Sequence, residues 1–367
     1  MNSSTVPAPK LVFDAHLDLA MNALEWNRDL RWTQERLRRS ELDADDNLRG
    51  RARHTVCFPE MRRANFGMCV ATQIARSVDY FSKMPGWRSP EQAWAQTQGQ
   101  LAWYRAMEEC GELVPIRNAR ELEAQTARWL DRTEEKLPIG YLLSLEGADS
   151  ILSWRHLEKS YADGLRALGP VHYGPGIYGH GTDDEGPLTA KGVELLKVME
   201  QLGLILDVTH LCDESFWDAL KRFSGPLWAS HHNCRALANW NRQLTDGQIK
   251  ALIERGAVIG MAFDAIMMVH GWMHKRSRPQ EFNLRIEKIC EHIDHICQIA
   301  GNAEHVGIGT DLDGGYGTEQ TPMDCDSIAD VARVAPLLAA RGYSQADIDG
   351  IMHGNFLRFL KQHLPRK

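Results

Sequence analysis

Imidazole and carboxylate side chains lie at the ends of several short apolar runs of this sequence, in types and spacings that suit metal chemistry. His16 and Asp18 stand two residues apart in FDAHLD. On an extended strand, residues two apart point the same way, so this imidazole and this carboxylate can bind one divalent metal ion together. On its own the pair is a weak signal, and further ligands are needed to support it.

Three such ligands lie at the ends of other apolar runs: Glu146 in SLEG, His210 in DVTH and His231 in ASHH. Taken singly, each could cap a strand end or make a structural hydrogen bond at a rim. Together with His16 and Asp18 they are too many for one tetrahedral zinc ion, but they suit two metals that share a carboxylate. We therefore predict a two-metal site with Glu146 as the bridge.

A further carboxylate is a candidate proton carrier. Asp311, in GIGTDLDGG, could accept a proton from an attacking water and deliver it to a leaving amine. Asp313 competes for this role, and either residue could instead cap a helix. His232 would point away from the site on a strand and is predicted to be structural. His292 and His295 lie in EHIDHIC, an expected helix, and are predicted to be surface or core residues.

The elements that must position these residues alternate along the chain. Apolar runs cover residues 11–18, 66–75, 139–147, 165–172, 202–210, 226–232, 257–264 and 305–314. Near-continuous apolar strands fit a parallel sheet covered by helices. Eight strand–helix units predict a (β/α)₈ TIM barrel, in which all trailing strand ends meet at one mouth. An open, doubly wound sheet is the alternative.

The segments between the runs support this order. Residues 191–201 (KGVELLKVMEQ) and 245–256 (TDGQIKALIERG) predict helices, the second with a Thr cap and a Gly stop. Residues 19–65 are rich in Arg, Asp and Asn and are expected to decorate the barrel mouth. No short repeat or low-complexity linker divides the chain, so residues 1–367 are predicted to form one domain.

Composition excludes some partners. The net charge of −7, with 43% hydrophobic and 25% charged residues, is typical of a soluble globular protein and argues against nucleic-acid binding. The densest basic run, residues 33–42, mixes Arg36, Arg38 and Arg39 with glutamates, which predicts a solvated helix face.

The sequence also lacks the signals of export and membrane insertion. Its start, MNSSTVPAPK, has no apolar signal-peptide stretch, and no run approaches the roughly 18 apolar residues of a membrane span. Its 8 cysteines form no CxxC pair, so reduced thiols are the simplest interpretation. We expect a cytoplasmic protein that does not bind membranes.

The order of these motifs resembles the membrane (renal) dipeptidase family of the amidohydrolase superfamily. The similar segments are FDAHLDL, LLSLEGADS, LGLILDVTHLCDESFWDAL, ASHHNCRAL, HVGIGTDLDGG and IMHGNFLRFL. They run from residue 13 to about residue 360. The most specific feature is the spacing of 21 residues between His210 in DVTH and His231 in ASHH. The resemblance implies a barrel with two divalent metal ions, usually Zn²⁺, that hydrolyses dipeptides, and it also implies a homodimer.

The resemblance further implies roles for single residues. His16 and Asp18 match ligands of one metal, His210 and His231 match ligands of the other, and Glu146 matches the bridge. Asp311 matches the family's catalytic acid and base. His172, which closes LRALGPVH, matches a histidine that holds the scissile carbonyl oxygen as it becomes an oxyanion. Arg242 matches the arginine that binds the terminal carboxylate of the dipeptide.

Three loops depart from the family pattern. The glutamate is normally followed by Gly-Gly-His, whereas residues 147–149 read Gly-Ala-Asp. Residues 243–245 read Gln-Leu-Thr where Asn-Val-Pro is frequent, and YGPGIYGHGTDDEG replaces the usual Asn-containing loop. These changes leave the metal ligands intact and alter the pocket, so they bear on the substrate more than on the chemistry. With Arg242 selecting a carboxylate, we expect hydrolysis of dipeptides or related small amides with a free carboxylate. A lactone or cyclic amide substrate, or a binding protein without catalysis, are the alternatives.

Overall fold

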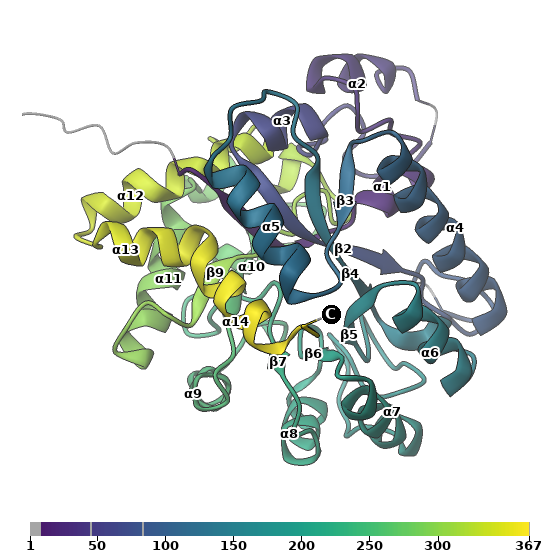
Figure 1. Cartoon of the computed structure of the whole chain (residues 1–367). Coiled ribbons are helices and arrows are strands. Elements are labelled where there is room, and N and C mark those ends of the chain that lie inside the picture. The colour runs from purple at the N-terminus through teal and green to yellow at the C-terminus, as the bar shows by residue number, and fades with distance from the viewer. Residues whose placement is uncertain (1–8, 45, 83, 367) are drawn as a thin grey trace, which may run out of the picture.

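A ring of parallel strands surrounded by helices forms the centre of the molecule (Figure 1). The computed structural model describes residues 9–44, 46–82 and 84–366. The strands of the ring are β1 (Val12–Leu17), β2 (Phe66–Ile74), β4 (Ile139–Glu146), β5 (Leu165–Gly169), β6 (Ile205–Asp207), β7 (Leu227–Trp228), β8 (Ile259–Met261) and β9 (Val306–Ile308). A strand that the sequence did not predict, β3 (Leu113–Pro115), pairs with β4 outside the ring.

The ring closes between β7 and β8, the two ends of the order in which the strands pair. Neighbours pair in the order β7-β6-β5-β4-β2-β1-β9-β8. Past the end of β7, Ala229 forms a parallel bridge with Ile259 of β8, and its amide donates to the carbonyl oxygen of Val258. The predicted (β/α)₈ TIM barrel is therefore confirmed, and the open doubly wound sheet is wrong.

Two glycines let the segment after β7 lie close to β8 and β9. A Cβ atom at Gly260 or at Gly309 would lie 1.9 Å from the carbonyl oxygen of Ser230. Any larger residue at either position would push this segment outward. The location of His231, the next residue, therefore depends on both glycines.

The helices begin and end largely where local signals predict. Helix α9 (Asp246–Glu254) starts after Thr245, which forms a capping box with Gln248, and α7 (Ala190–Leu202) ends before Gly203 in the left-handed conformation. The other helices are α1 (Leu19–Glu25), α2 (Gln34–Ser40), α3 (Phe58–Arg63), α4 (Pro90–Glu109), α5 (Ala119–Leu130), α6 (Trp154–Ala162), α8 (Asp213–Arg222), α10 (Ala265–Met268), α11 (Glu287–Ala300), α12 (Val334–Ala340), α13 (Gln345–Asp349) and α14 (Asn355–His363).

Residues 19–65 cover part of the barrel mouth, as predicted. Arg28 is buried and donates to Glu41 (2.7 Å), to Asn22 (2.7 Å) and to the carbonyl oxygen of Gly50 (2.7 Å), which ties this segment together. Residues 47–49 line the cavity at the mouth. In α2, Arg36 and Arg39 are exposed, as predicted, whereas Arg38 is half-buried and pairs with Asp326 (2.8 Å) instead of facing solvent.

Other predictions concern the ends of the chain and its cysteines. Residues 1–8, the start for which no signal peptide is predicted, lie outside the described residues. In the part of the chain that the structure describes, no helix is both long and apolar enough to cross a bilayer. All cysteines are free thiols.

Candidate metal centre and substrate pocket

The predicted ligands come from the trailing ends of four barrel strands. His16 lies on β1, Asp18 is the N-cap of α1, and Glu146 is the last residue of β4. His210 and His231 were predicted to end their strands, but each lies in a loop, three residues past β6 and β7 respectively. His210 has a φ of 72°, which turns the chain sharply after β6.

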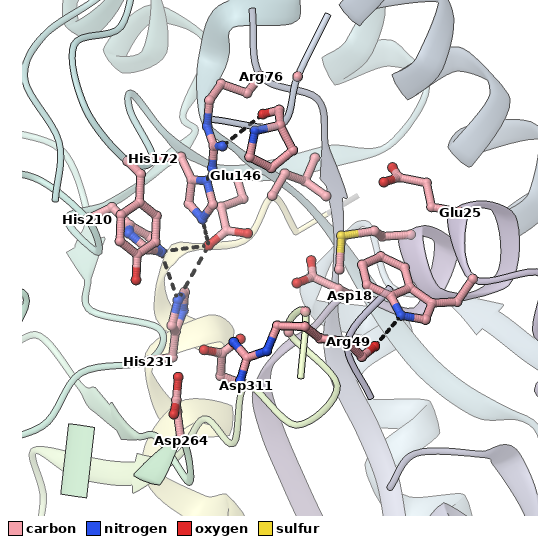
Figure 2. Close-up of a pocket in the computed structure, with 18 of the residues that line it drawn as sticks. Asp18, Glu25, Arg49, Arg76, Glu146, His172, His210, His231, Asp264 and Asp311 are labelled. Atoms are coloured by element: carbon pink, nitrogen blue, oxygen red, sulfur yellow. Dashed lines mark hydrogen bonds and ion pairs between the residues drawn. The ribbon is translucent and has the colours of Figure 1, made fainter. Parts of the chain in front are cut away.

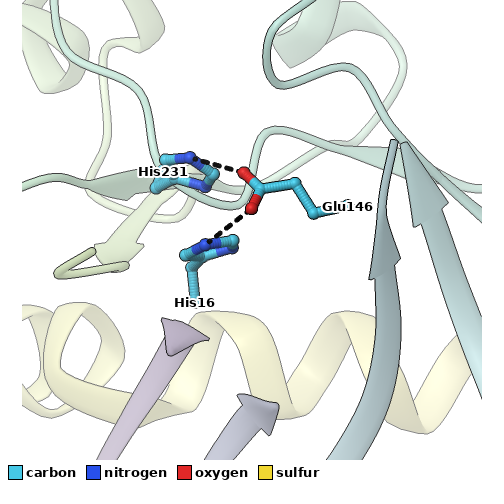
Figure 3. Close-up of side chains that lie close together, drawn as sticks. All are labelled: His16, Glu146 and His231. Carbon is cyan, nitrogen blue, oxygen red and sulfur yellow. Dashed lines mark ion pairs between the residues drawn. The ribbon is translucent and has the colours of Figure 1, made fainter. Parts of the chain in front are cut away.

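The two carboxylate oxygens of Glu146 face different imidazoles. Oε2 lies 3.6 Å from Nε2 of His16, whereas Oε1 lies 3.0 Å from Nε2 of His210 and 3.4 Å from Nε2 of His231. Figure 3 shows His16 and His231 at opposite oxygens of the same carboxylate. A carboxylate in this arrangement can bridge two neighbouring cations.

His16 is surrounded by negative charge. Its Nε2 atom lies 3.7 Å from Asp18, 3.6 Å from Glu146 and 3.8 Å from Asp311. Within the described chain, both of its ring nitrogens are buried and have no hydrogen-bond partner. Burial lowers the pKa of His16, but the carboxylates, Glu146 first, raise it to about 10. A buried, unpartnered imidazole nitrogen among three carboxylates fits a divalent cation, which would bind both kinds of ligand.

The other two imidazoles are oriented by hydroxyl groups. Nδ1 of His210 lies 3.0 Å from Oγ1 of Thr182, and Nδ1 of His231 lies 2.9 Å from Oγ of Ser230. Burial lowers the pKa of both histidines well below the usual value. A neutral imidazole that donates from Nδ1 to a hydroxyl directs its Nε2 lone pair into the site, as a metal ligand must.

Three overlapping groups have ligand atoms close enough to hold an ion. Within each group the atoms lie within 4.8 Å of one another: His16, Glu146 and His231; Glu146, His172 and His210; and His16, Asp18 and Asp311. Glu146 belongs to two groups and His16 to two. The residues present therefore fit a metal site, and their donor types are those that zinc prefers.

Asp311 and Asp313 have different surroundings. The carboxylate of Asp313 accepts hydrogen bonds from Thr55 and Val56 and lies 3.7 Å from Arg28. The carboxylate of Asp311 accepts no hydrogen bond from the described residues and lines the cavity. Of the two competing candidates, Asp311 is the one whose carboxylate is free to exchange a proton at the site.

A cavity of about 390 Å³ opens beside the cluster (Figure 2). His172 and Arg242 both line it, so all the predicted site residues gather in one region. Nη2 of Arg242 donates to the carbonyl oxygen of His231 (3.1 Å), whereas Nη1 is buried and lacks a partner among the described residues. A buried guanidinium nitrogen without an acceptor can take a carboxylate from a ligand.

The cavity also contains charged residues that sequence reasoning missed. Asp264 closes the apolar run at 257–264, and Arg76 directly follows the run at 66–75. Glu146 was found because it is a polar residue at the end of an apolar run, and Asp264 and Arg76 could have been found in the same way. Glu25 and Arg49 belong to the segment over the mouth, where no periodic pattern indicates which side chains point inward.

The histidines predicted to be structural lie outside this cavity. Nδ1 of His292 accepts from the amide of Cys234 (3.1 Å), and its Nε2 lies 3.1 Å from the carbonyl oxygen of Met268. His295 pairs with Asp246 at 2.8 Å. His232 is buried next to His231 but does not line the cavity. His292 and His295 thus lie outside the site, as predicted, whereas His232 lies in a loop rather than on a strand, its Nδ1 has no partner among the described residues, and its structural role stays a prediction.

A parallel barrel whose strand ends gather imidazoles and carboxylates beside a cavity is an architecture of metal-dependent hydrolases. The sequence model of the membrane dipeptidase family (Peptidase family M19) matches residues 3–365. The chain belongs to this family of metallopeptidases, as its motifs indicate.

The chain is also similar to individual curated proteins. An uncharacterized protein from the pqqA 5′ region of Klebsiella pneumoniae is 32% identical over 63% of this chain and 85% of its own length. Dipeptidase tcpJ of Claviceps purpurea is 24% identical over 55% of this chain and 41% of its own length. Apart from the Klebsiella protein, the chain spans about half the length of the curated relatives it matches.

Solved structures share the fold. The metallo peptidase from Rhodobacter sphaeroides, liganded with a phosphinate mimic of L-Ala-D-Ala, superposes with a TM-score of 0.77 at 23% identity, covering 97% of this chain and 99% of its own. A dipeptidase AC of family M19 gives the same TM-score at 24% identity, covering 96% of this chain and 98% of its own.

Proposed function

We propose that this chain, acting as one domain, is a binuclear metal-dependent dipeptidase that hydrolyses dipeptides or closely related small amides with a free carboxylate. The observation that carries the proposal is the geometry of Glu146, whose oxygens face His16 on one side and His210 and His231 on the other. This supports two neighbouring ions. His16 and Asp18 would bind one, the other two histidines would bind the second, and the donor types favour Zn²⁺.

When bound, the two ions would lower the pKa of a water molecule and polarise the scissile carbonyl. Asp311, whose carboxylate is free of hydrogen bonds from the described residues, would take the proton of the attacking water and deliver it to the leaving amine. His172 would donate a hydrogen bond to the carbonyl oxygen as negative charge develops on it. Both side chains line the same cavity, so one bound substrate can reach them together.

The pocket supports a small substrate with a terminal carboxylate. Its volume of about 390 Å³ suits a dipeptide. Nη1 of Arg242 is buried and lacks an acceptor among the described residues, and a substrate carboxylate would supply one. A lactone or cyclic amide has no such carboxylate, so Arg242 favours the dipeptide. The relatives named dipeptidases, and the phosphinate dipeptide mimic held by the Rhodobacter protein, point the same way.

The proposal is tested on the purified full chain by elemental analysis and a substrate panel. The panel contains dipeptides with L and D C-terminal residues, the same dipeptides with an amidated C-terminus, and a lactone. We expect about two metal ions per chain and turnover of the dipeptides with a free carboxylate in preference to their amidated counterparts and the lactone. Turnover of the lactone alone, or of no dipeptide at full metal loading, would overturn the dipeptidase assignment.

A further inference from the structure

Two residues from different strand ends, Arg76 and His172, contact each other at the cavity wall (Figure 2). Arg76 lies two residues past β2, and His172 lies three residues past β5. Nη2 of Arg76 contacts Nδ1 of His172, and Nη1 of Arg76 donates to the carbonyl oxygen of Pro85 (3.0 Å). A guanidinium has only hydrogen-bond donors, so Nδ1 of His172 must be the acceptor.

We propose that Arg76 is a positioning residue that holds His172 in the tautomer with its hydrogen on Nε2, directed at the reacting carbonyl. This inference rests on the proposed function, because it concerns the oxyanion contact of His172. Nε2 of His172 lies 3.8 Å from Oε1 of Glu146, on the side of the metal centre. His172 also lines the cavity, so the hydrogen that Arg76 holds on Nε2 lies on the side where the proposed function places the substrate carbonyl.

This arrangement decides between two roles for His172. By distance alone, His172 could join Glu146 and His210 as a ligand, since their ligand atoms lie within 4.8 Å of one another. A protonated Nε2 has no lone pair to give to a metal ion, but it is a good donor to a developing oxyanion. Arg76 therefore keeps His172 out of the ligand set and makes it a hydrogen-bond donor.

Asp149 ties together the two loops that carry this pair. Its Oδ2 accepts from the amide of Ser77 (3.2 Å), next to Arg76, and its Oδ1 accepts from the amide of Ile177 (3.1 Å), in the loop after His172. Asp149 is buried, at 5% exposure. The loop after Glu146 thus links the loop that carries Arg76 to the loop that carries His172.

The positive charge of Arg76 also affects how strongly His172 binds the carbonyl oxygen. A cationic donor at Nδ1 polarises the imidazole ring, which strengthens the hydrogen bond that Nε2 donates. The guanidinium is held on one side by Pro85, and its carbon lies 6.0 Å from the centroid of the Tyr173 ring. Loss of one oxyanion donor typically lowers kcat by about 10²–10³-fold.

The first test measures the tautomer directly. In the zinc-loaded protein, long-range ¹H–¹⁵N correlation spectra of the imidazoles identify the protonated nitrogen of His172, with His172→Asn for assignment. We expect the hydrogen on Nε2 in the wild type and in Arg76→Lys, which keeps a donor-only cation, and an altered spectrum in Arg76→Met. A hydrogen or a metal on Nδ1 in the wild type, or an unchanged spectrum in Arg76→Met, would overturn the proposal.

The second test measures kcat and KM separately, with a dipeptide that the wild-type enzyme hydrolyses. Arg76→Met should lower kcat by about 10²–10³-fold, leave KM within about threefold and add no loss to His172→Ala. Arg76→Lys should recover part of the rate. Arg88→Met, an exposed arginine of the same loop, is the control. A raised KM with unchanged kcat would mean that Arg76 binds substrate itself. If the wild type hydrolyses no dipeptide, the proposed function fails while the tautomer experiment still decides this inference.

Discussion

Asp313 holds Thr55 through two hydrogen bonds of 2.8 Å, one from the backbone amide and one from the hydroxyl group. The amide of Val56 donates a third, at 2.9 Å. All three residues are buried, so water cannot replace these bonds. The contact fastens the segment over the barrel mouth to the loop after β9, and the rim of the pocket depends on it.

Replacing this carboxylate should cost stability rather than chemistry. In Asp313→Asn an NH₂ group replaces one acceptor oxygen, which leaves a buried donor without its partner. We expect the free energy of unfolding to fall by about 1–3 kcal/mol, as measured by urea denaturation. Asp131→Asn, at an exposed position, serves as the matched control and should change little. An unchanged stability would show that the segment over the mouth is held by other contacts.

The neighbouring carboxylate should behave in the opposite way. Asp311 accepts no hydrogen bond from the described residues and lies 3.8 Å from Nε2 of His16. We expect Asp311→Asn to lower kcat by about 10²–10⁴-fold, because proton transfer is lost. Its metal content should stay that of the wild type. The measurement is steady-state hydrolysis of a dipeptide, with Asp313→Asn assayed beside it. Retention of activity by Asp311→Asn and its loss in Asp313→Asn would reverse the two assignments.

Metal stoichiometry tests the role of Glu146. Because its two oxygens face separate imidazoles, Glu146→Ala should weaken the binding of both ions. His16→Ala should mainly weaken the binding of the first ion, and His210→Ala that of the second. Elemental analysis after dialysis against metal-free buffer measures the number retained. His295→Ala, which removes a histidine outside the cavity, should retain the wild-type content. Equal loss in all three site variants would contradict the bridging role.

Removal of the metals should destabilise the folded chain. Asp18, Glu146 and Asp311 surround His16, and without cations their mutual repulsion is compensated only in part. A ligand at 100 times its Kd stabilises the folded state by about 2.7 kcal/mol per site. We therefore expect a chelator to lower Tm and added Zn²⁺ to restore it. Glu146→Ala should show a much smaller shift, and an identical shift in that variant would place the metals elsewhere.

The barrel and the order of its strands could be predicted because each strand is a local apolar run between helical segments. The lengths of the strands could not be predicted in the same way. Of the run at 226–232, only Leu227–Trp228 form a strand. The residues after Trp228 lie against Gly260 and Gly309, where a larger side chain would not fit. Hydrogen bonding between distant segments determines where a strand ends, and a single segment does not contain that information.

The candidate site shows the same limit. The ligand types and the shared mouth follow from strand-end positions, so Glu146 and His16 could be located. From strand geometry alone the choice between Asp311 and Asp313 could not be made, because both have positive φ angles (56° and 63°) and the alternation of a strand does not apply to them. Only the family resemblance favoured Asp311. Arg76 and His172 are 96 residues apart, and no local pattern predicts their contact.

Arg242 provides the sharpest test of substrate class. Its Nη1 atom is buried without an acceptor among the described residues, and its Nη2 atom supports the carbonyl oxygen of His231. A charge-assisted hydrogen bond contributes about 1.5–3 kcal/mol, so Arg242→Ala should raise KM for dipeptides with a free carboxylate by about 10–150-fold, with kcat changed far less. Arg242→Lys should recover part of the affinity as a point charge.

Amidated dipeptides distinguish the two contacts of this side chain. They lack the carboxylate, so any KM measured for them should already be high in the wild type and should not rise further in Arg242→Ala. If KM rose equally for both kinds of substrate, or kcat fell for both, Arg242 would act through His231 and the metal centre instead. The carboxylate would then be recognised elsewhere, and Arg49, which also lines the cavity, would be the next residue to replace.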